Sequence, residues 1–173
     1  MTDREPVETT NLDRYGSDPL PWDRAREQLM TEPDPGVPWF LGTGRPDGSP
    51  HAAGVGCVWF DGDIYFTSSP ETRKARNIAA DPACTISVRL PGIDLVLEGR
   101  ASVVTDTPTL EQVAEVFRSG GWPAEVADGA FTAPFSAPSA GPPPWQVYRF
   151  VFGTAFGVAT AEPYGATRWR FKV

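Results

Sequence analysis

Three cations fall within four residues of a chain that is otherwise acidic. Arg73, Lys74 and Arg76 lie in the stretch Ser68–Pro82 (SSPETRKARNIAADP), whereas the whole chain carries 22 acidic and 15 basic residues. The macrodipole disfavours cations in the first turn of a helix, so a bound phosphate that neutralises them would explain their position. Pairing with acidic neighbours such as Glu71 would explain it equally well, and charge alone leaves both interpretations open.

The residues before these cations are typical of a helix start. Ser69 and Pro70 suit the N-cap and the first helical position, after the strand-like run DIYFT. Free backbone N–H groups at such a start favour an anion. Hydroxyl side chains that could join them are Thr67, Ser68, Ser69 and Thr72.

Other candidate motifs give weaker signals. GTGRPDG, which begins at Gly42, lacks the GxGxxG spacing of dinucleotide-binding loops and leads into a strand, so its glycines are interpreted as hairpin residues. The only histidine, His51, has no partner at metal-ligand spacing, and no metal site is predicted. A Ser-His-Asp arrangement stays open because such partners meet only in space, but there is no GxSxG and a strand-end histidine is the simpler interpretation.

The C-terminal TRWRF places Trp169 between two arginines, Arg168 and Arg170. The tryptophan could present a stacking face for a ring. Strand alternation alone predicts a core tryptophan flanked by exposed arginines, and on the residues alone this second interpretation is favoured.

Composition excludes several classes of protein. The net charge of -7 leaves no basic field for a nucleic-acid backbone or an anionic membrane. No apolar run approaches the roughly 20 residues that span a bilayer, and the N-terminal residues are polar, so a soluble cytoplasmic protein is expected. Cys57 and Cys84 lie in apolar runs and are expected to be reduced, buried thiols, although a bridge between them stays open.

The periodicities predict a mostly β domain with a few peripheral helices. Strand-like segments, about seven in number, are joined by turns such as Pro46-Asp47-Gly48 and Asp61-Gly62, which predicts an all-β, antiparallel barrel of Greek-key type. A three-strand meander is expected over 39–68, with strands at 39–44, 51–60 and 63–68, and separate strands are expected over 146–152 and 156–160. Helices are expected at about 18–30, 69–80 and 107–119.

The expected domain organisation is a flexible arm over residues 1–17 and a single domain over 18–173. The first helix should end in the proline-rich TEPDPGVP, 31–38. A long Pro- and Ala-rich loop is predicted over 122–144. Its aromatic residues Phe131 and Phe135, with Trp145 just after it, favour a functional role for the loop, such as a lid over a substrate.

The order of these motifs resembles a known family. WFLGT, RPDGSPHAAGV, DGDIYFTSS, TRKARNIAADPACTISV and DLVLEGRASVVTD, over about Val37–Asp106, are similar to the pyridoxamine 5'-phosphate oxidase-like flavin-binding split barrels. The resemblance is strongest to the branch with deazaflavin (coenzyme F-420) oxidoreductases, and TRWRF also fits that branch. It implies an antiparallel split β-barrel, a homodimer, and a cofactor at the subunit interface.

The resemblance also implies cofactor-binding residues. Thr72, Arg73 and Lys74 match the element that binds the ribityl phosphate, with Thr67 and the hydroxyl of Ser68 just before it. Segments expected to pass the ring system are Gly54, Val55, Gly56 and Cys57, and further matches are Asn77, Trp169 and Arg170.

The implied activity is hydride transfer between a reduced cofactor, F-420 ahead of FMN, and a small organic acceptor. No catalytic side chain can be assigned. Oxidation of vitamin B6 is not expected, because that activity needs an Arg-x-His element near the C-terminus and the only histidine is His51. Alternatives are a non-catalytic carrier of flavin or haem, and a dimeric barrel whose groove has lost its cofactor.

Overall fold

The structure, a computed structural model, describes residues 4–31, 36–137 and 140–173. Residues 1–3 of the predicted arm, 32–35 of the predicted proline-rich helix end and 138–139 of the predicted loop lie outside these ranges.

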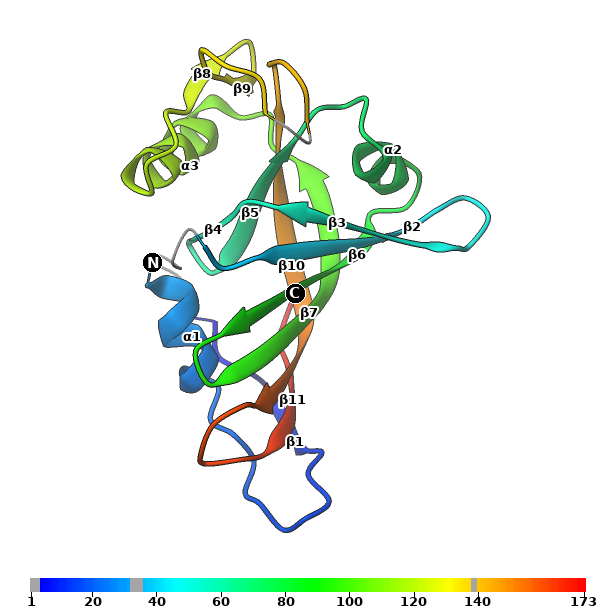
Figure 1. The fold of residues 1–173 in the computed structure, drawn as a ribbon, viewed down its shortest axis with the longest axis vertical. Helices are drawn as coiled ribbons and strands as arrows, with labels where there is room; N and C mark the ends of the chain where they lie inside the picture. Colours follow the sequence, from blue (N-terminus) through cyan, green and yellow to red (C-terminus); the bar gives the residue numbers. More distant parts are fainter. Residues whose placement is uncertain (1–3, 32–35, 138–139) are drawn as a thin grey trace.

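An antiparallel barrel forms the centre of the molecule (Figure 1). Its strands run in the order β1-β11-β10-β7-β6-β2-β3, and β5 pairs with both β10 and β4. A separate hairpin is formed by β8 and β9. The strands are β1 (Glu8–Asn11), β2 (Trp39–Gly44), β3 (Pro50–Val55), β4 (Cys57–Phe60), β5 (Asp63–Ser68), β6 (Ala83–Leu90), β7 (Ile93–Val103), β8 (Glu125–Ala127), β9 (Ala130–Thr132), β10 (Gln146–Ala159) and β11 (Ala166–Arg170).

The mostly β class and the split-barrel prediction are confirmed, but the prediction of about seven strands is wrong. Eleven strands are present within the described ranges. The predicted strand 51–60 is broken at Gly56, so that β3 pairs with β2 whereas β4 pairs with β5. The predicted meander over 39–68 is therefore two separate hairpins. Short strands also occur in the predicted arm and in the predicted loop.

Strand β10 explains how the barrel closes. Its first residues, Gln146–Phe150, pair with β5, and its last ones, Thr154–Val158, pair with β11. On its other edge it pairs with β7, with a register shift between Phe152 and Thr154. Such a bulge bends a strand sharply. The single strand β10 therefore pairs within two regions of the barrel, where the sequence predicts two separate strands.

Three helices lie at the periphery: α1 (Asp23–Met30), α2 (Arg73–Ala80) and α3 (Thr107–Ser119). Asp106 caps α3 by accepting a hydrogen bond from the Thr109 backbone N–H, 3.0 Å, and Pro108 occupies the first turn. The cap of α2 is Thr72 and not the predicted Ser69. The reason is that residues 69–72 form a turn in which the Thr72 N–H and hydroxyl both donate to the Ser69 carbonyl.

Two hydrophobic clusters hold these elements. The larger fills the barrel, and the smaller lies beneath α3 and the β8–β9 hairpin. Strand β5 separates them, since Ile64 and Phe66 face the barrel core and Tyr65 faces the smaller cluster. In Figure 1, α2 and the unit of α3, β8 and β9 lie at the same end of the barrel, and β1 and β11 lie at the other.

The predicted flexible arm is joined to the barrel in its described part. Strand β1 pairs with β11, from Glu8 opposite Arg170 to Asn11 opposite Thr167. Before it, the Arg4 guanidinium donates to the buried carboxylate of Asp63, 3.1 Å, and to the Phe152 carbonyl, 2.8 Å. These contacts fix residues 4–11 against the barrel.

Candidate cofactor-binding site

The ammonium group of Lys74 is the least expected feature of this end of the barrel. Lys74 is the second residue of α2, and only 5% of its surface is exposed. It makes no hydrogen bond or ion pair with any residue that the structure describes. Burial lowers the pKa of Lys74 because the charged form is desolvated. A partly desolvated cation without a counter-ion is unfavourable, and a bound anion would offset that cost.

A cavity of about 980 Å³ opens beside this ammonium group. Its first wall is formed by residues from β3, β4, β5 and α2, which include the strand break at Gly56. Six predicted cofactor-binding residues lie together in this wall: Gly54, Val55, Gly56, Cys57, Thr67 and Lys74.

The two glycines of this wall leave room for a ligand. A Cβ at Gly56 would meet no atom within 4 Å, and a Cβ at Gly54 would meet only the Trp39 carbonyl, at 4.0 Å. Neither glycine has a positive φ, so the backbone itself would accept a side chain. The missing side chains therefore widen the cavity along the β3–β4 edge. A flat ring could approach the backbone closely there.

Sequence reasoning missed the other residues that line the cavity. Trp59 of β4 and Leu29 and Met30 of α1 lie on one side, and residues of α3 and the segment after it lie on the other: Val116, Phe117, Trp122, Ala137 and Ala140. Trp122 and the two alanines belong to the predicted loop over 122–144. These three residues place part of that loop at the cavity, and a role for it as a lid stays a prediction. The aromatic content of that loop was the only sequence signal for this wall.

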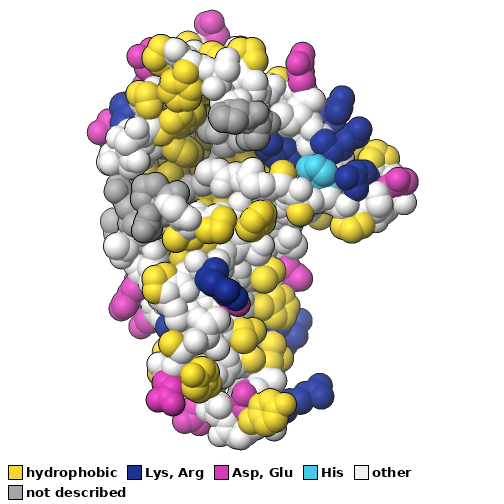
Figure 2. All heavy atoms as spheres, viewed as in Figure 1, with side chains coloured by type: hydrophobic (Ala, Val, Ile, Leu, Met, Phe, Trp, Pro, Cys, Tyr) yellow, Lys and Arg dark blue, Asp and Glu magenta, His cyan; other side chains and the backbone are white. Residues whose placement is uncertain are grey.

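The remaining cations of the cluster lie outside the cavity. Arg73 and Arg76 are exposed on α2. Figure 2 shows lysine and arginine side chains gathered around the chain's single histidine, near the β2–β3 hairpin. The pKa of His51 is lowered by burial and, to a smaller extent, by the charges of Arg45, Lys74 and Arg73. This surface therefore has a positive potential.

Three of the predicted site residues support α2 from behind the cavity wall. The Ser68 hydroxyl lies 2.7 Å from that of Thr72, which accepts the Ala75 N–H at 3.3 Å. Asn77 is 1% exposed and donates to Thr43 Oγ1, 2.9 Å, so that it fastens α2 to β2. Asn77 Oδ1 has no partner among the described residues.

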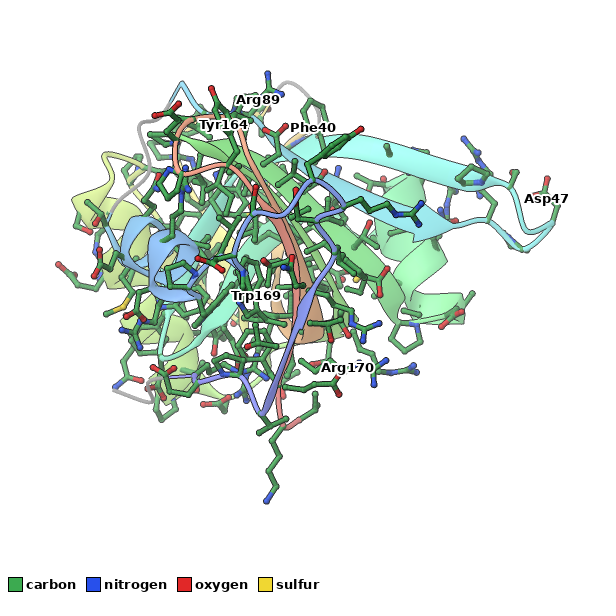
Figure 3. All side chains as sticks on the ribbon, turned by 90° about the horizontal axis from the view of Figure 1, so that it is seen from below. Phe40, Asp47, Arg89, Tyr164, Trp169 and Arg170 are labelled. Carbon is green, nitrogen blue, oxygen red and sulfur yellow. The ribbon has the colours of Figure 1, made fainter. Side chains whose placement is uncertain are left out.

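Trp169 and Arg170 are not brought to this cavity within one chain. Trp169 is fully buried, its indole N–H donates to the Leu20 carbonyl at 3.2 Å, and its ring lies 5.4 Å from that of Trp22. A Cβ at Gly157 would come within 2.6 Å of the Trp169 ring. Figure 3 shows Trp169 inside the barrel and Arg170 toward its outside. The core tryptophan predicted from strand alternation is confirmed, and of the two arginines predicted to be exposed, Arg170 is exposed whereas Arg168 is partly buried.

The thiols are both free. Cys57 lines the cavity, and burial raises its pKa far above the ordinary value. Burial likewise raises the pKa of Cys84 to about 12. Cys57 is therefore a neutral thiol, neither a base nor a thiolate nucleophile.

Comparison with protein families shows the relationship of the chain. The sequence pattern of the family described as pyridoxamine 5'-phosphate oxidase matches residues 37–151, more than half of the chain. The chain belongs to the pyridoxamine 5'-phosphate oxidase family. In this family member, the matched range contains all six predicted residues of the first cavity wall.

Solved structures share this family fold. An F420 reductase is 24% identical, with a TM-score of 0.53, and the match covers 75% of this chain and 94% of that one. A NimC/NimA family protein from Clostridium acetobutylicum is 19% identical, with a TM-score of 0.55 and coverages of 84% and 91%. A heme binding protein from Mycobacterium smegmatis is 15% identical, with a TM-score of 0.55 and coverages of 75% and 52%. No curated protein matches the sequence.

Among the helices in the described ranges, none is long and apolar enough to cross a bilayer. No cluster of three or more His, Cys, Asp or Glu side chains suited to a metal ion occurs in the same ranges.

Proposed function

We propose that this family member is an oxidoreductase that binds a flavin or a deazaflavin in the 980 Å³ cavity. The observation that carries the proposal is Lys74, a largely buried residue that lines the cavity and has no described partner for its charge. A cofactor phosphate would supply the missing charge. The ring system would lie along Gly54–Cys57, where a ligand can approach the backbone.

The size and lining of the cavity support this assignment. Ligand pockets have volumes of roughly 300–1,000 Å³ and combine apolar walls with a few placed polar groups. This cavity lies at the upper end of that range, which suits a cofactor together with a second, smaller molecule. Its wall contains one cation, Lys74, among the described residues.

The chain's own contribution would be positioning. A reduced flavin or deazaflavin, when bound, would supply a hydride, which carries both electrons, and the acceptor would also take up one proton from solvent. Lys74 would hold the phosphate, the β3–β4 edge would orient the ring, and the aromatic residues of the cavity would exclude water. Cys57 keeps its proton because its pKa is raised.

Coenzyme F-420 is the favoured cofactor, and FMN follows it. Both carry the ribityl phosphate that Lys74 would bind, whereas the deazaflavin also has an acidic tail that needs a path lined by cations. Arg45 and Arg73, whose charges both act on His51, would provide that path outside the cavity. The similarity to an F420 reductase supports the same choice.

We also propose that two copies form the functional unit. Phe40, Val96 and Val158 are exposed, by 48%, 38% and 53%, on strands β2, β7 and β10 of one sheet. A second copy would cover them, and it would bring its own Arg170 to a shared surface. Light scattering coupled to gel filtration should give twice the mass of the chain, and a monomer at micromolar concentration would contradict this part of the proposal.

A non-catalytic flavin carrier is the second candidate. It is favoured because no cavity-lining side chain in the described ranges is an evident general acid or base apart from Lys74. A haem carrier is less well supported, since the only histidine, His51, does not line the cavity.

The test is a side-by-side titration of the protein with FMN and F-420, followed through tryptophan fluorescence. Trp59 and Trp122 line the cavity, so binding there should quench the emission with a micromolar dissociation constant for at least one cofactor. The absence of quenching by both would contradict the proposal. If a reduced cofactor binds but is oxidised by neutral enones and quinones no faster than without protein, the carrier is the better description.

A further inference from the structure

The cavity has two chemically different walls. The wall formed by β3, β4, β5 and α2 holds Lys74 and the two glycines. The opposite wall comes from α3 and the segment after it, and consists of Val116, Phe117, Trp122, Ala137 and Ala140 together with Ser119 and Gly120. This second wall has no charged side chain among its described members.

The second wall is held firmly in place. The Trp122 ring lies edge-on to Phe117, with centroids 5.1 Å apart, and 5.5 Å from that of Trp145, which is 1% exposed. The Trp122 backbone N–H donates to the Phe117 carbonyl at 2.9 Å. The Ala137 N–H donates to the Gly141 carbonyl at 2.9 Å, so the segment after β9 is also fastened to the chain leading into β10.

The cation of α3 already has partners within the protein. Arg118 forms a salt bridge with Glu115, 2.8 Å, and donates to the Ala124 carbonyl at 2.7 Å. An anion placed against the second wall would lose its hydration without gaining a cation, because Lys74 lies in the first wall. Burial of an unpaired charge is strongly disfavoured. An uncharged ligand has no such cost.

We infer that the second wall is the binding subsite for the electron acceptor, and that the acceptor is an uncharged, planar, conjugated ring compound. This inference rests on the proposed function. Trp122 of the second wall provides an aromatic face or edge for such a ring, and Trp59 of β4 provides another from the first wall. The methyl groups of Ala137 and Ala140 set the width of the subsite, and a larger side chain at either position would narrow it.

The test compares two naphthoquinones that differ in charge. Menadione is neutral, and 1,4-naphthoquinone-2-sulfonate carries a permanent negative charge on the same bicyclic ring. Their dissociation constants are measured by calorimetry on protein saturated with FMN. Menadione should bind at least roughly tenfold more tightly, because the sulfonate finds no cation in the second wall.

Two matched variants locate the binding. Ala137→Leu adds a larger side chain at the cavity. It should raise the menadione dissociation constant at least roughly tenfold while leaving FMN binding unchanged. Ala127→Leu makes the same change at an exposed position of β8 and should affect neither ligand. Unchanged FMN binding in Ala137→Leu shows that the variant is folded.

Equal or tighter binding of the sulfonate would overturn the inference, and so would unaltered menadione binding in Ala137→Leu. Failure of the proposed function looks different, because FMN then fails to bind the unaltered protein. In that case both quinones are measured on Lys74→Met protein, which lacks the cation of the first wall. The Lys74→Met protein must still bind menadione more tightly than the sulfonate, and Ala137→Leu must still weaken menadione binding. Otherwise the inference is wrong.

Discussion

Replacement of Lys74 by methionine should weaken flavin binding and, at the same time, stabilise the protein without its ligand. Methionine has a similar length and no charge, so it keeps the packing of a side chain that is 5% exposed. A hydrogen bond to a charged group contributes about 1.5–3 kcal/mol, which corresponds to a dissociation constant about 10- to 150-fold higher for FMN.

The stability change has the opposite sign. Most of the Lys74 side chain is buried and its charge has no described partner, so in the free protein the charge is partly desolvated, at a cost on the order of 1 kcal/mol. Each kcal/mol recovered should raise the melting temperature by about 2–4 °C for a chain of this size. Addition of FMN should stabilise the unaltered protein much more than the variant.

The effect of pH follows from the pKa of Lys74, which burial lowers below its ordinary value of 10.5. Between the lowered folded-state pKa and 10.5, the unfolded chain binds more protons than the folded chain. The free energy of unfolding contributed by this side chain therefore rises with pH across that window. The stability advantage of Lys74→Met should be largest below the window and should shrink as the pH rises through it.

Arg76→Met is the matched control, because it removes a positive charge from an exposed position of the same helix. Binding is followed by fluorescence titration, and stability by calorimetry with and without FMN. The reasoning is refuted if Lys74→Met binds FMN as tightly as the unaltered protein, or if both variants lose affinity equally.

Three further predictions concern other parts of the molecule. Gly56→Val should place its side chain in the cavity and raise the FMN dissociation constant at least roughly tenfold, without loss of stability. The control Gly44→Val, also in open space, should leave FMN binding unchanged. Equal FMN binding by the two variants would show that no ligand lies against Gly56. The His51 proton resonances, the only imidazole signals of the chain, should titrate with a pKa below 6.5. Bound FMN should raise that pKa, because its phosphate neutralises nearby cations. An identical titration with and without FMN would place the phosphate elsewhere. Asp63→Asn should destabilise the protein by about 3 kcal/mol in urea unfolding, since it breaks a buried ion-pair network. Arg149→Met should cost only about 1 kcal/mol because its side chain is half-exposed, and equal costs would contradict this assignment.

Local sequence signals predicted the first wall of the cavity. Lys74 after DIYFT and the glycines before Cys57 belong to short motifs, and the family resemblance joined them in one site, whereas Arg73 and Arg76 of the same motif lie outside the cavity. The end of α1 at Met30 and the extent of α3 were also predicted, since turn residues and capping residues act within a few positions.

The features that sequence reasoning missed depend on contacts between residues far apart in the chain. Trp122 is far along the chain from Gly56, and only the packing of α3 against β4 brings them to the same cavity. The break between β3 and β4 depends on which partner strand each one finds, and alternation within 51–60 contains no such information. The bulge that makes β10 a single strand is likewise fixed by its pairing with β7.

The most direct test of the central claim is a crystal structure of the protein with FMN. The account predicts a phosphate oxygen within about 2.7–3.2 Å of Lys74 Nζ, with the ring system along Gly54–Cys57. A flavin bound outside the cavity, with the Lys74 ammonium group still unpaired, would contradict it.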